Sequence, residues 1–317
     1  MISIQLVWIL TIIEFVGQLL ARRILSRIGI SVAANNFGKI KAIICFALVI
    51  LCALMDENPE MINIADSVLL ACIVLSSASM VFKFIPTRLY ADLLSGLNFI
   101  CGVTSLVLTY QHHFAWATCI IIAGQLFDLF DGRMALKHGG TRYGPYLDDI
   151  ADFTSFGLAP AYVIVEKGGS MAWFVGGFYV IGVAFRLIRF IAKDKNRSDL
   201  PAGIFNGLPS PAGAMIVLGA SLITTEATTW VLLLLTSVSV AFMISHIRFA
   251  HFGRVILKQI PRPVFFTISA AIILTISFIL KTKSIQTFGY LILGSLIVYL
   301  IAGSIIGKKF SLSAFDM

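Results

Sequence analysis

The chain has 317 residues, of which 58% are hydrophobic and only 13% are charged, and its formal net charge is +8. Soluble domains are about a quarter charged, so this composition excludes an ordinary soluble protein and favours an all-α protein that crosses the membrane many times. The positive charge does not indicate a nucleic-acid partner. The basic residues lie between apolar segments, as they do in loops that contact anionic lipid head groups.

The apolar segments come close to the length of about 20 residues that a helix needs to cross a bilayer. Eleven spans are predicted: 4–21, 38–55, 62–82, 92–110, 114–135, 146–166, 171–191, 208–224, 228–246, 264–280 and 286–306. The first lacks a basic leading region and an obvious cleavage site, so we expect a retained span rather than a cleaved signal.

The basic residues of the connections gather on one side of these predicted spans. On that side lie all of the 24 Lys and Arg residues except Lys167, Lys281 and Lys283. Because cytoplasmic loops carry the excess of Lys and Arg, the N-terminus is predicted to lie outside and the C-terminus in the cytoplasm. We expect the protein to reside in the cell (inner) membrane among its lipids.

A short segment before the fourth span differs from the others. Residues 82–91 mix aromatic side chains with Lys83 and Arg88 beside Pro86. This composition predicts an interfacial helix on the cytoplasmic leaflet. The connections are too short for a separate soluble domain.

A cluster of acidic residues interrupts the apolar chain between positions 128 and 152. Asp128 and Asp131 are three positions apart, and Asp148 and Asp152 are four apart, so each pair shares one face of a helix. Asp149 points about 100° away from Asp148 and is left out. Four carboxylates beside a membrane are costly unless a cation binds between them, so we predict a two-metal site that acts on a phosphate. The alternative is a set of solvated turn residues.

The spacing of these residues carries a resemblance. The signature D-x-x-D-G-x-x-A-(R)…G-x-x-x-D-x-x-x-D is matched by Asp128, Asp131, Gly132, Ala135, Gly144, Asp148 and Asp152. This pattern resembles the CDP-alcohol phosphotransferase family of membrane enzymes. One position departs from it, because Leu136 stands where arginine is usual. Lys137 or Arg133 is then expected to supply the missing charge, although lysine offers a point charge rather than a fork of donors.

The resemblance implies an architecture and a set of roles. It implies a six-helix core within 92–255, preceded by about three extra spans in 1–81 and followed by two more and a tail in 256–317. Two divalent cations, Mg²⁺ or Mn²⁺, are implied at Asp128, Asp131, Asp148 and Asp152, with Asp152 also the general base. Contacts with the CDP group are implied for Asn98, Asp131, Gly132, Ala135 and Gly144. A homodimer is implied too, and Asn98 has the alternative role of pairing two helices.

Two longer runs are similar to a branch of the family. Residues 148–157 (DDIADFTSFG) and 205–214 (FNGLPSPAGA) resemble the corresponding runs of bacterial and archaeal phosphatidylserine synthases. This similarity implies CDP-diacylglycerol and L-serine as the substrates, phosphatidylserine and CMP as the products, and no nucleic acid.

Four further polar residues are candidates for binding serine or phosphate. Arg186 and Arg189 lie one turn apart at a cytoplasmic helix end and are predicted to bind an anionic group. The alternative is that they anchor this helix end. Asn206 and Ser210 flank Gly207 and are predicted to offer polar contacts in a broken helix, or else to form a plain turn.

Other functions remain open at this point. The same chemistry suits another alcohol, such as glycerol phosphate, inositol phosphate or choline. A transporter with a cation site within the membrane is the alternative from another class. Leu136 also fits a homologue without catalytic activity.

Overall fold

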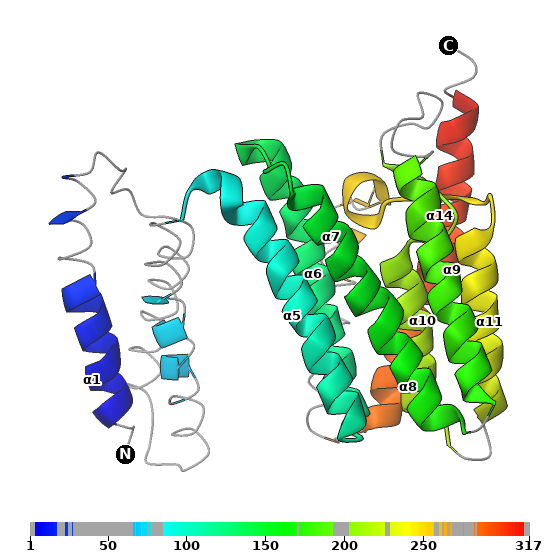
Figure 1. Cartoon of the computed structure of the whole chain (residues 1–317), viewed down its shortest axis with the longest axis horizontal. Coiled ribbons are helices and arrows are strands. Elements are labelled where there is room, and N and C mark those ends of the chain that lie inside the picture. The colour runs from blue at the N-terminus through cyan, green and yellow to red at the C-terminus, as the bar shows by residue number, and fades with distance from the viewer. Residues whose placement is uncertain are drawn as a thin grey trace. The chain divides into compact units, whose positions relative to one another are not determined.

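The computed structural model describes residues 4–17, 85–169, 171–192, 203–225, 229–256 and 284–313, with scattered residues between 23 and 77 and between 260 and 282 (Figure 1). The chain divides into two compact units, Met1–Thr87 and Arg88–Met317. The predicted span 38–55 lies outside the described residues, and 264–280 does so almost entirely.

The first unit contains one described helix. This helix, α1, covers Ile4–Ile12 and continues as a π-helical turn, Ile13–Gly17. No residue of α1 is buried, as expected for an apolar helix that faces lipid. The carboxylate of Glu14 accepts a hydrogen bond from the hydroxyl of Ser76.

The second unit is a bundle of apolar helices. Its helices are α5 (Tyr90–Tyr110), α6 (Phe114–His138), α7 (Gly144–Asp152), α8 (Ala159–Gly168), α9 (Ala172–Ala192), α10 (Ser210–Ile223), α11 (Thr229–Ile244) and α14 (Ile285–Ser313). The π-helical turn η3, Phe153–Leu158, joins α7 and α8 into one continuous helical segment. The phenol of Tyr179 donates 2.8 Å to the carbonyl oxygen of Phe156 within this turn.

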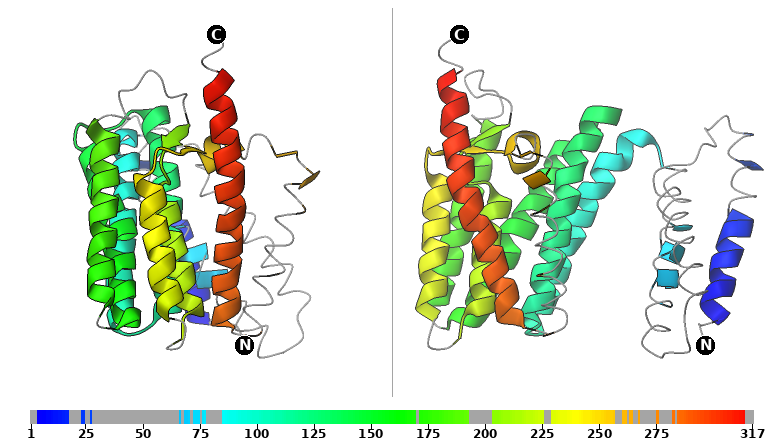
Figure 2. Two further views of the ribbon diagram at one scale, coloured as in Figure 1. Left: turned by 90° about the vertical axis from the view of Figure 1, so that its right-hand side faces the viewer. Right: turned by 180° about the vertical axis from the view of Figure 1, so that it is seen from behind.

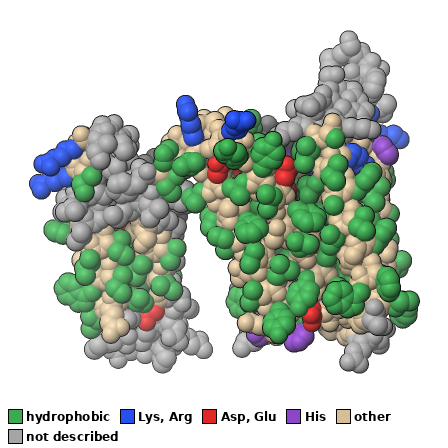
Figure 3. Space-filling model, in the orientation of Figure 1, with side chains coloured by type: hydrophobic (Ala, Val, Ile, Leu, Met, Phe, Trp, Pro, Cys, Tyr) green, Lys and Arg blue, Asp and Glu red, His purple; other side chains and the backbone are tan. Residues whose placement is uncertain are grey.

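Several of these helices are suited to a bilayer. Those over Thr87–Tyr110, Phe114–His138, Ala172–Ala192 and Ile285–Lys309 are long and apolar enough to cross one. Apolar side chains cover the flanks of the bundle, while Lys and Arg gather towards one end (Figure 3). The all-α membrane class is therefore confirmed, whereas the total of eleven spans stays a prediction.

The entry into α5 differs from the interfacial helix predicted over 82–91. Within the described part of that segment, 85–91, a bend leads into one 3-10 turn, Thr87–Leu89, and α5 begins directly at Tyr90. Pro86 lacks a backbone N–H and disfavours helix before it, so a regular helix starts only after this residue.

The core centres on α10. Every residue from Ala212 to Leu222 on this helix is buried, which is typical of a helix surrounded by others. The largest buried side chains packed there include Phe156, Tyr179, Leu218 and Leu232. Helix α14 packs along α10 (Figure 2).

A short antiparallel ribbon closes one end of the bundle. Strand β1 (Ile204–Asn206) pairs with β2 (Arg248–Ala250), with Phe205 opposite Phe249. The sequence predicted only a broken helix or a turn here. Two three-residue strands carry no clear alternation, so pairing between segments 44 positions apart had no local signal.

Candidate active site

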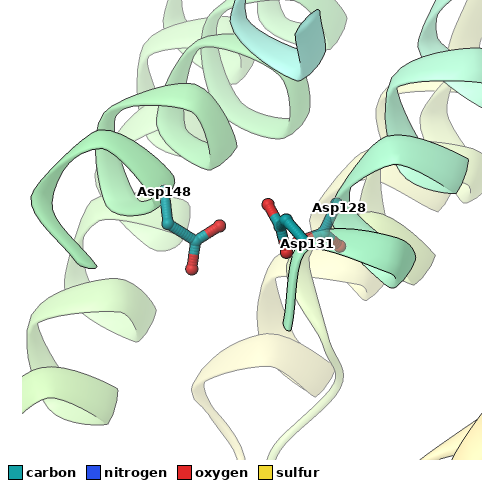
Figure 4. Close-up of side chains that lie close together, drawn as sticks. All are labelled: Asp128, Asp131 and Asp148. Carbon is teal, nitrogen blue, oxygen red and sulfur yellow. The ribbon is translucent and has the colours of Figure 1, made fainter. Parts of the chain in front are cut away.

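Three carboxylates meet between the C-terminal half of α6 and helix α7. Asp128 and Asp131 project from α6, and Asp148 projects from α7 towards them (Figure 4). One carboxylate oxygen of each lies within 4.8 Å of the others. The predicted acidic faces of α6 and α7 are thus both present, and the fold brings the two helices together at these carboxylates.

This donor set fits a divalent cation. Carboxylate oxygens are the ligands that Mg²⁺ and Mn²⁺ prefer, and opposite ligands of Mg²⁺ lie about 4.2 Å apart. The three carboxylate oxygens, at most 4.8 Å apart, therefore need to move only a little to reach that geometry. Three carboxylates at this distance also repel one another unless a positive charge lies between them.

The fourth predicted carboxylate lies next to this group. Asp152 lies one turn after Asp148, and its charge interacts with those of Asp128 and Asp148. Its Oδ1 accepts a hydrogen bond of 3.2 Å from the side-chain nitrogen of Asn98. Asp152 therefore adjoins the three converging carboxylates rather than completing their group, and Asn98 fixes its orientation.

Helix α5 supplies a contact that the sequence analysis missed. The hydroxyl of Ser95 donates 2.7 Å to Oδ2 of Asp131, and both residues are buried. The available signal was the polar pair Ser95 and Asn98, spaced three apart in an apolar helix. Asn98 is itself fully buried, which favours its alternative role between helices.

Two glycines let the helices around the site approach closely. A Cβ at Gly102 of α5 would lie 2.6 Å from the hydroxyl of Ser155, which donates to the backbone carbonyl of Asn98. A Cβ at Gly124 of α6 would lie 2.8 Å from Oδ1 of Asn98. Side chains at either position would separate α5 from the carboxylate-bearing segments.

The sequence analysis also missed Asp92, which gives a different reason for the glycine at position 144. The hydroxyl of Thr141 donates 2.6 Å to Oδ2 of Asp92 and accepts 3.0 Å from the backbone N–H of Gly144. A Cβ at Gly144 would lie 2.7 Å from Oδ1 of Asp92. Glycine was expected there to admit a nucleotide, but in the structure Asp92 occupies that space.

The basic residues expected to replace the missing arginine lie elsewhere. Arg133 and Lys137 are exposed, about 140° and 180° around α6 from Asp128. The guanidinium of Arg133 instead lies 5.9 Å from the ring centroid of Phe130. The structure therefore does not bring either residue to the carboxylates. Leu136 is 78% exposed, and Gly132 and Ala135 are partly buried on α6.

Among the described residues, Arg186 is a buried cation whose charge interacts with those of the carboxylates. It lies on α9, and these carboxylates are Asp152 and Asp128. Its Nη1 donates 2.6 Å to the hydroxyl of Ser210, the first residue of α10. Arg186 and Ser210 were both predicted to bind serine or phosphate, and their contact with each other is consistent with a shared site.

Arg189 has a different environment. Its Nη1 donates to the carbonyls of Ile244 and Ser245, and its Nη2 donates to those of Met243 and Asn206. These bonds satisfy C-terminal carbonyls of α11, so Arg189 joins α9 to the end of α11, a role that neither predicted alternative described. Asn206 meets Arg189 through its backbone rather than its side chain.

The region that holds these residues matches a known family. The model of the CDP-alcohol phosphatidyltransferases matches residues 88–244. The CDP-diacylglycerol–serine O-phosphatidyltransferase of Helicobacter pylori is 31% identical over 181 residues, which are 54% of this chain and 75% of that protein. The chain belongs to the CDP-alcohol phosphatidyltransferase family.

Two other relatives carry the same name as the Helicobacter protein. The Mycobacterium leprae enzyme is 34% identical over 129 residues, 39% of this chain and 43% of that protein. The Saccharomyces cerevisiae enzyme is 34% identical over 143 residues, 41% of this chain and 52% of that protein. The chain therefore spans only about half the length of these two relatives.

Every residue predicted for the site lies within the matched region, and so do Asp92, Ser95 and Thr141. The N-terminal unit up to Thr87, strand β2 and helix α14 lie outside it. The chain thus extends beyond the matched region on both sides.

Proposed function

We propose that the protein is a phosphatidylserine synthase, which transfers the phosphatidyl group of CDP-diacylglycerol to the hydroxyl of L-serine and releases CMP. The convergence of Asp128, Asp131 and Asp148 beside Asp152 and Arg186 carries this proposal. The names of the similar proteins in two bacteria and a yeast support serine as the alcohol.

We propose two divalent cations, Mg²⁺ or Mn²⁺, as the cofactors. Asp128, Asp131 and Asp148 would hold them. Asp152 would be a further ligand when both cations are bound. When bound, the cations supply positive charge to the pyrophosphate and to the departing CMP.

Asp152 acts as the general base in this proposal. Asn98 holds one oxygen of its carboxylate, which leaves the other to take the proton of the serine hydroxyl. The serine oxygen then forms a bond to the lipid-linked phosphorus. The bond from that phosphorus to the oxygen of CMP breaks, and CMP leaves with the electron pair.

Arg186 and Ser210 form the proposed serine subsite. Serine carries a carboxylate, and Arg186 offers a buried positive charge beside Asp152, where the serine hydroxyl must lie. The hydroxyl of Ser210 fixes the guanidinium. The nucleotide contacts proposed from the family resemblance are Asp131, Gly132 and Ala135 on α6, where the two small residues obstruct little.

We also propose that the site faces the cytoplasm of a cell membrane, with the N-terminus outside and the C-terminus inside. The one-sided distribution of Lys and Arg supports this orientation. A homodimer is proposed from the family resemblance alone. Light scattering of the purified protein in detergent tests it, and a monomeric mass would refute it.

The activity is tested with purified protein in detergent, supplied with CDP-diacylglycerol and either Mg²⁺ or Mn²⁺. Labelled serine should enter the lipid fraction while CMP is released in equal amount. Glycerol phosphate, inositol phosphate and choline serve as competing alcohols in parallel reactions. CMP release with one of these but not with serine would keep the chemistry and overturn the choice of alcohol. The absence of CMP release with every alcohol and metal would overturn the proposal altogether.

A further inference from the structure

Helix α5 bears a stripe of polar side chains at every third position. Asp92, Ser95 and Asn98 follow one another at this spacing in a helix that is otherwise largely apolar. Such residues lie within one side of a helix, because three positions correspond to about 300° of rotation. None of the motif's aspartates lies on α5 itself.

Each member of the stripe contacts a different part of the aspartate motif. Asn98 donates to Asp152, and Ser95 donates to Asp131. Asp92 accepts from Thr141 in the connection between α6 and α7. A single rigid helix thus touches both carboxylate-bearing helices and the segment that joins them.

The contact of Asp92 determines where α7 begins. The hydroxyl of Thr141 links Oδ2 of Asp92 to the backbone N–H of Gly144, the first residue of α7. Oδ1 of Asp92 is buried against Gly144 and has no hydrogen-bond partner among the described residues. Contact with this oxygen therefore leaves no room for a side chain at position 144.

The start of α7 in turn places a metal-binding carboxylate. Asp148 lies four residues after Gly144, about one helical turn along, so a shift at Gly144 moves Asp148 relative to Asp128 and Asp131. Residues that orient metal ligands without touching the metal commonly change metal affinity 10–100-fold when they are replaced.

We propose that Asp92 is a positioning residue of the metal site, which acts through Thr141 and Gly144 to hold Asp148 opposite Asp128 and Asp131. Ser95 and Asn98 perform the same task for Asp131 and Asp152. The inference rests on the proposed metal-dependent function and extends it to a helix that carries no ligand of its own.

The experiment measures Mn²⁺ binding to the full chain in detergent, by the electron paramagnetic resonance signal of free Mn²⁺, without nucleotide or serine. Asp92→Ala and Thr141→Val should each weaken Mn²⁺ binding by about tenfold or more, whereas Thr141→Ser should retain it. Gly144→Ala should also weaken binding, because its new Cβ meets Asp92. Gly140→Ala is the matched control in the same connection, where a Cβ meets only Ala135 at 3.9 Å.

A double variant distinguishes positioning from general loss of structure. In Asp92→Ala the obstructing carboxylate is gone, so adding Gly144→Ala should cost little further affinity. Independent losses that multiply in the double variant would overturn the proposal, as would wild-type Mn²⁺ affinity in Asp92→Ala and Thr141→Val. A wild-type chain that binds no Mn²⁺ would overturn it too. The serine assay remains a separate test, since these measurements contain no substrate.

Discussion

At the scale of single residues, side chains that look equivalent in the sequence have different environments in the structure. Arg186 and Arg189 are one turn apart on α9, yet Arg186 donates to Ser210 and its charge interacts with those of Asp152 and Asp128, while Arg189 donates to backbone carbonyls of α11 and β1. The difference arises because the neighbours of each position come from distant segments. Equal spacing therefore does not imply an equal role.

Asp152→Asn should lower kcat by about 10²–10⁴-fold, because the amide cannot accept the proton of the serine hydroxyl. Mn²⁺ binding should weaken less in this variant than in Asp148→Asn, because the other three aspartates converge without Asp152. Asp148→Asn is the comparison, since it removes one of those three converging carboxylates. Steady-state kinetics and Mn²⁺ titration check both variants. Undiminished turnover in Asp152→Asn would refute its role as the base.

Arg189→Gln should destabilise the protein by at least about 2 kcal/mol, because buried carbonyls at the end of α11 lose their donors. Thermal unfolding in detergent measures this effect. Arg133→Gln is the control, since Arg133 is exposed and its guanidinium lies over the ring of Phe130, and it should stay within about 0.5 kcal/mol of the wild type. Equal stability of the two variants would argue against the anchoring role of Arg189.

At the scale of elements, α14 is joined to the family core through small residues. A Cβ at Gly289 of α14 would lie 2.9 Å from the carbonyl oxygen of Gly219 on α10. Tyr299, further along α14, donates 3.3 Å to the carbonyl of Ala250 in β2 and stacks on Phe249. Helices in membranes commonly associate where small residues let their backbones approach closely, and α14 packs against α10 in this way.

Gly289→Leu should therefore separate α14 from α10 and destabilise the protein by about 1–3 kcal/mol. Gly294→Leu provides a matched control on the same helix, because nothing lies within 4 Å of a Cβ there. Thermal unfolding of both variants, purified in the same detergent, makes the comparison. An equal shift for the two would mean that the contact at Gly289 does not hold α14.

At the scale of the whole molecule, the chain joins a shared catalytic core to parts outside the family region. Lys and Arg gather towards one end of the helical bundle (Figure 3). Asp128, Asp131 and Asp148 lie on either side of the connection between α6 and α7. In the proposed reaction, the soluble alcohol would reach the site from the side of this connection, and the lipid substrate would enter from the bilayer. This arrangement makes the orientation of the chain a functional property.

Orientation is checked by labelling cysteines with a maleimide that does not cross membranes. Cysteine introduced at His113, in the turn between α5 and α6, should react in intact cells. Cysteine at Arg142, in the connection between α6 and α7, should react only after the membrane is permeabilised. The wild-type chain gives the background from native cysteines. The reverse pattern would invert the proposed topology.

The sequence alone determined the membrane class, the aspartate motif and the family, because these depend on composition and on spacing within one or two helical turns. It also placed Asp128 and Asp131 on one helix face correctly. Only the tertiary structure decided that Asp92, Ser95 and Asn98 of α5 hold this motif in place, and that Arg189 anchors α11. Those contacts join segments tens of residues apart, and their partners are chosen by the packing of helices rather than by local pattern.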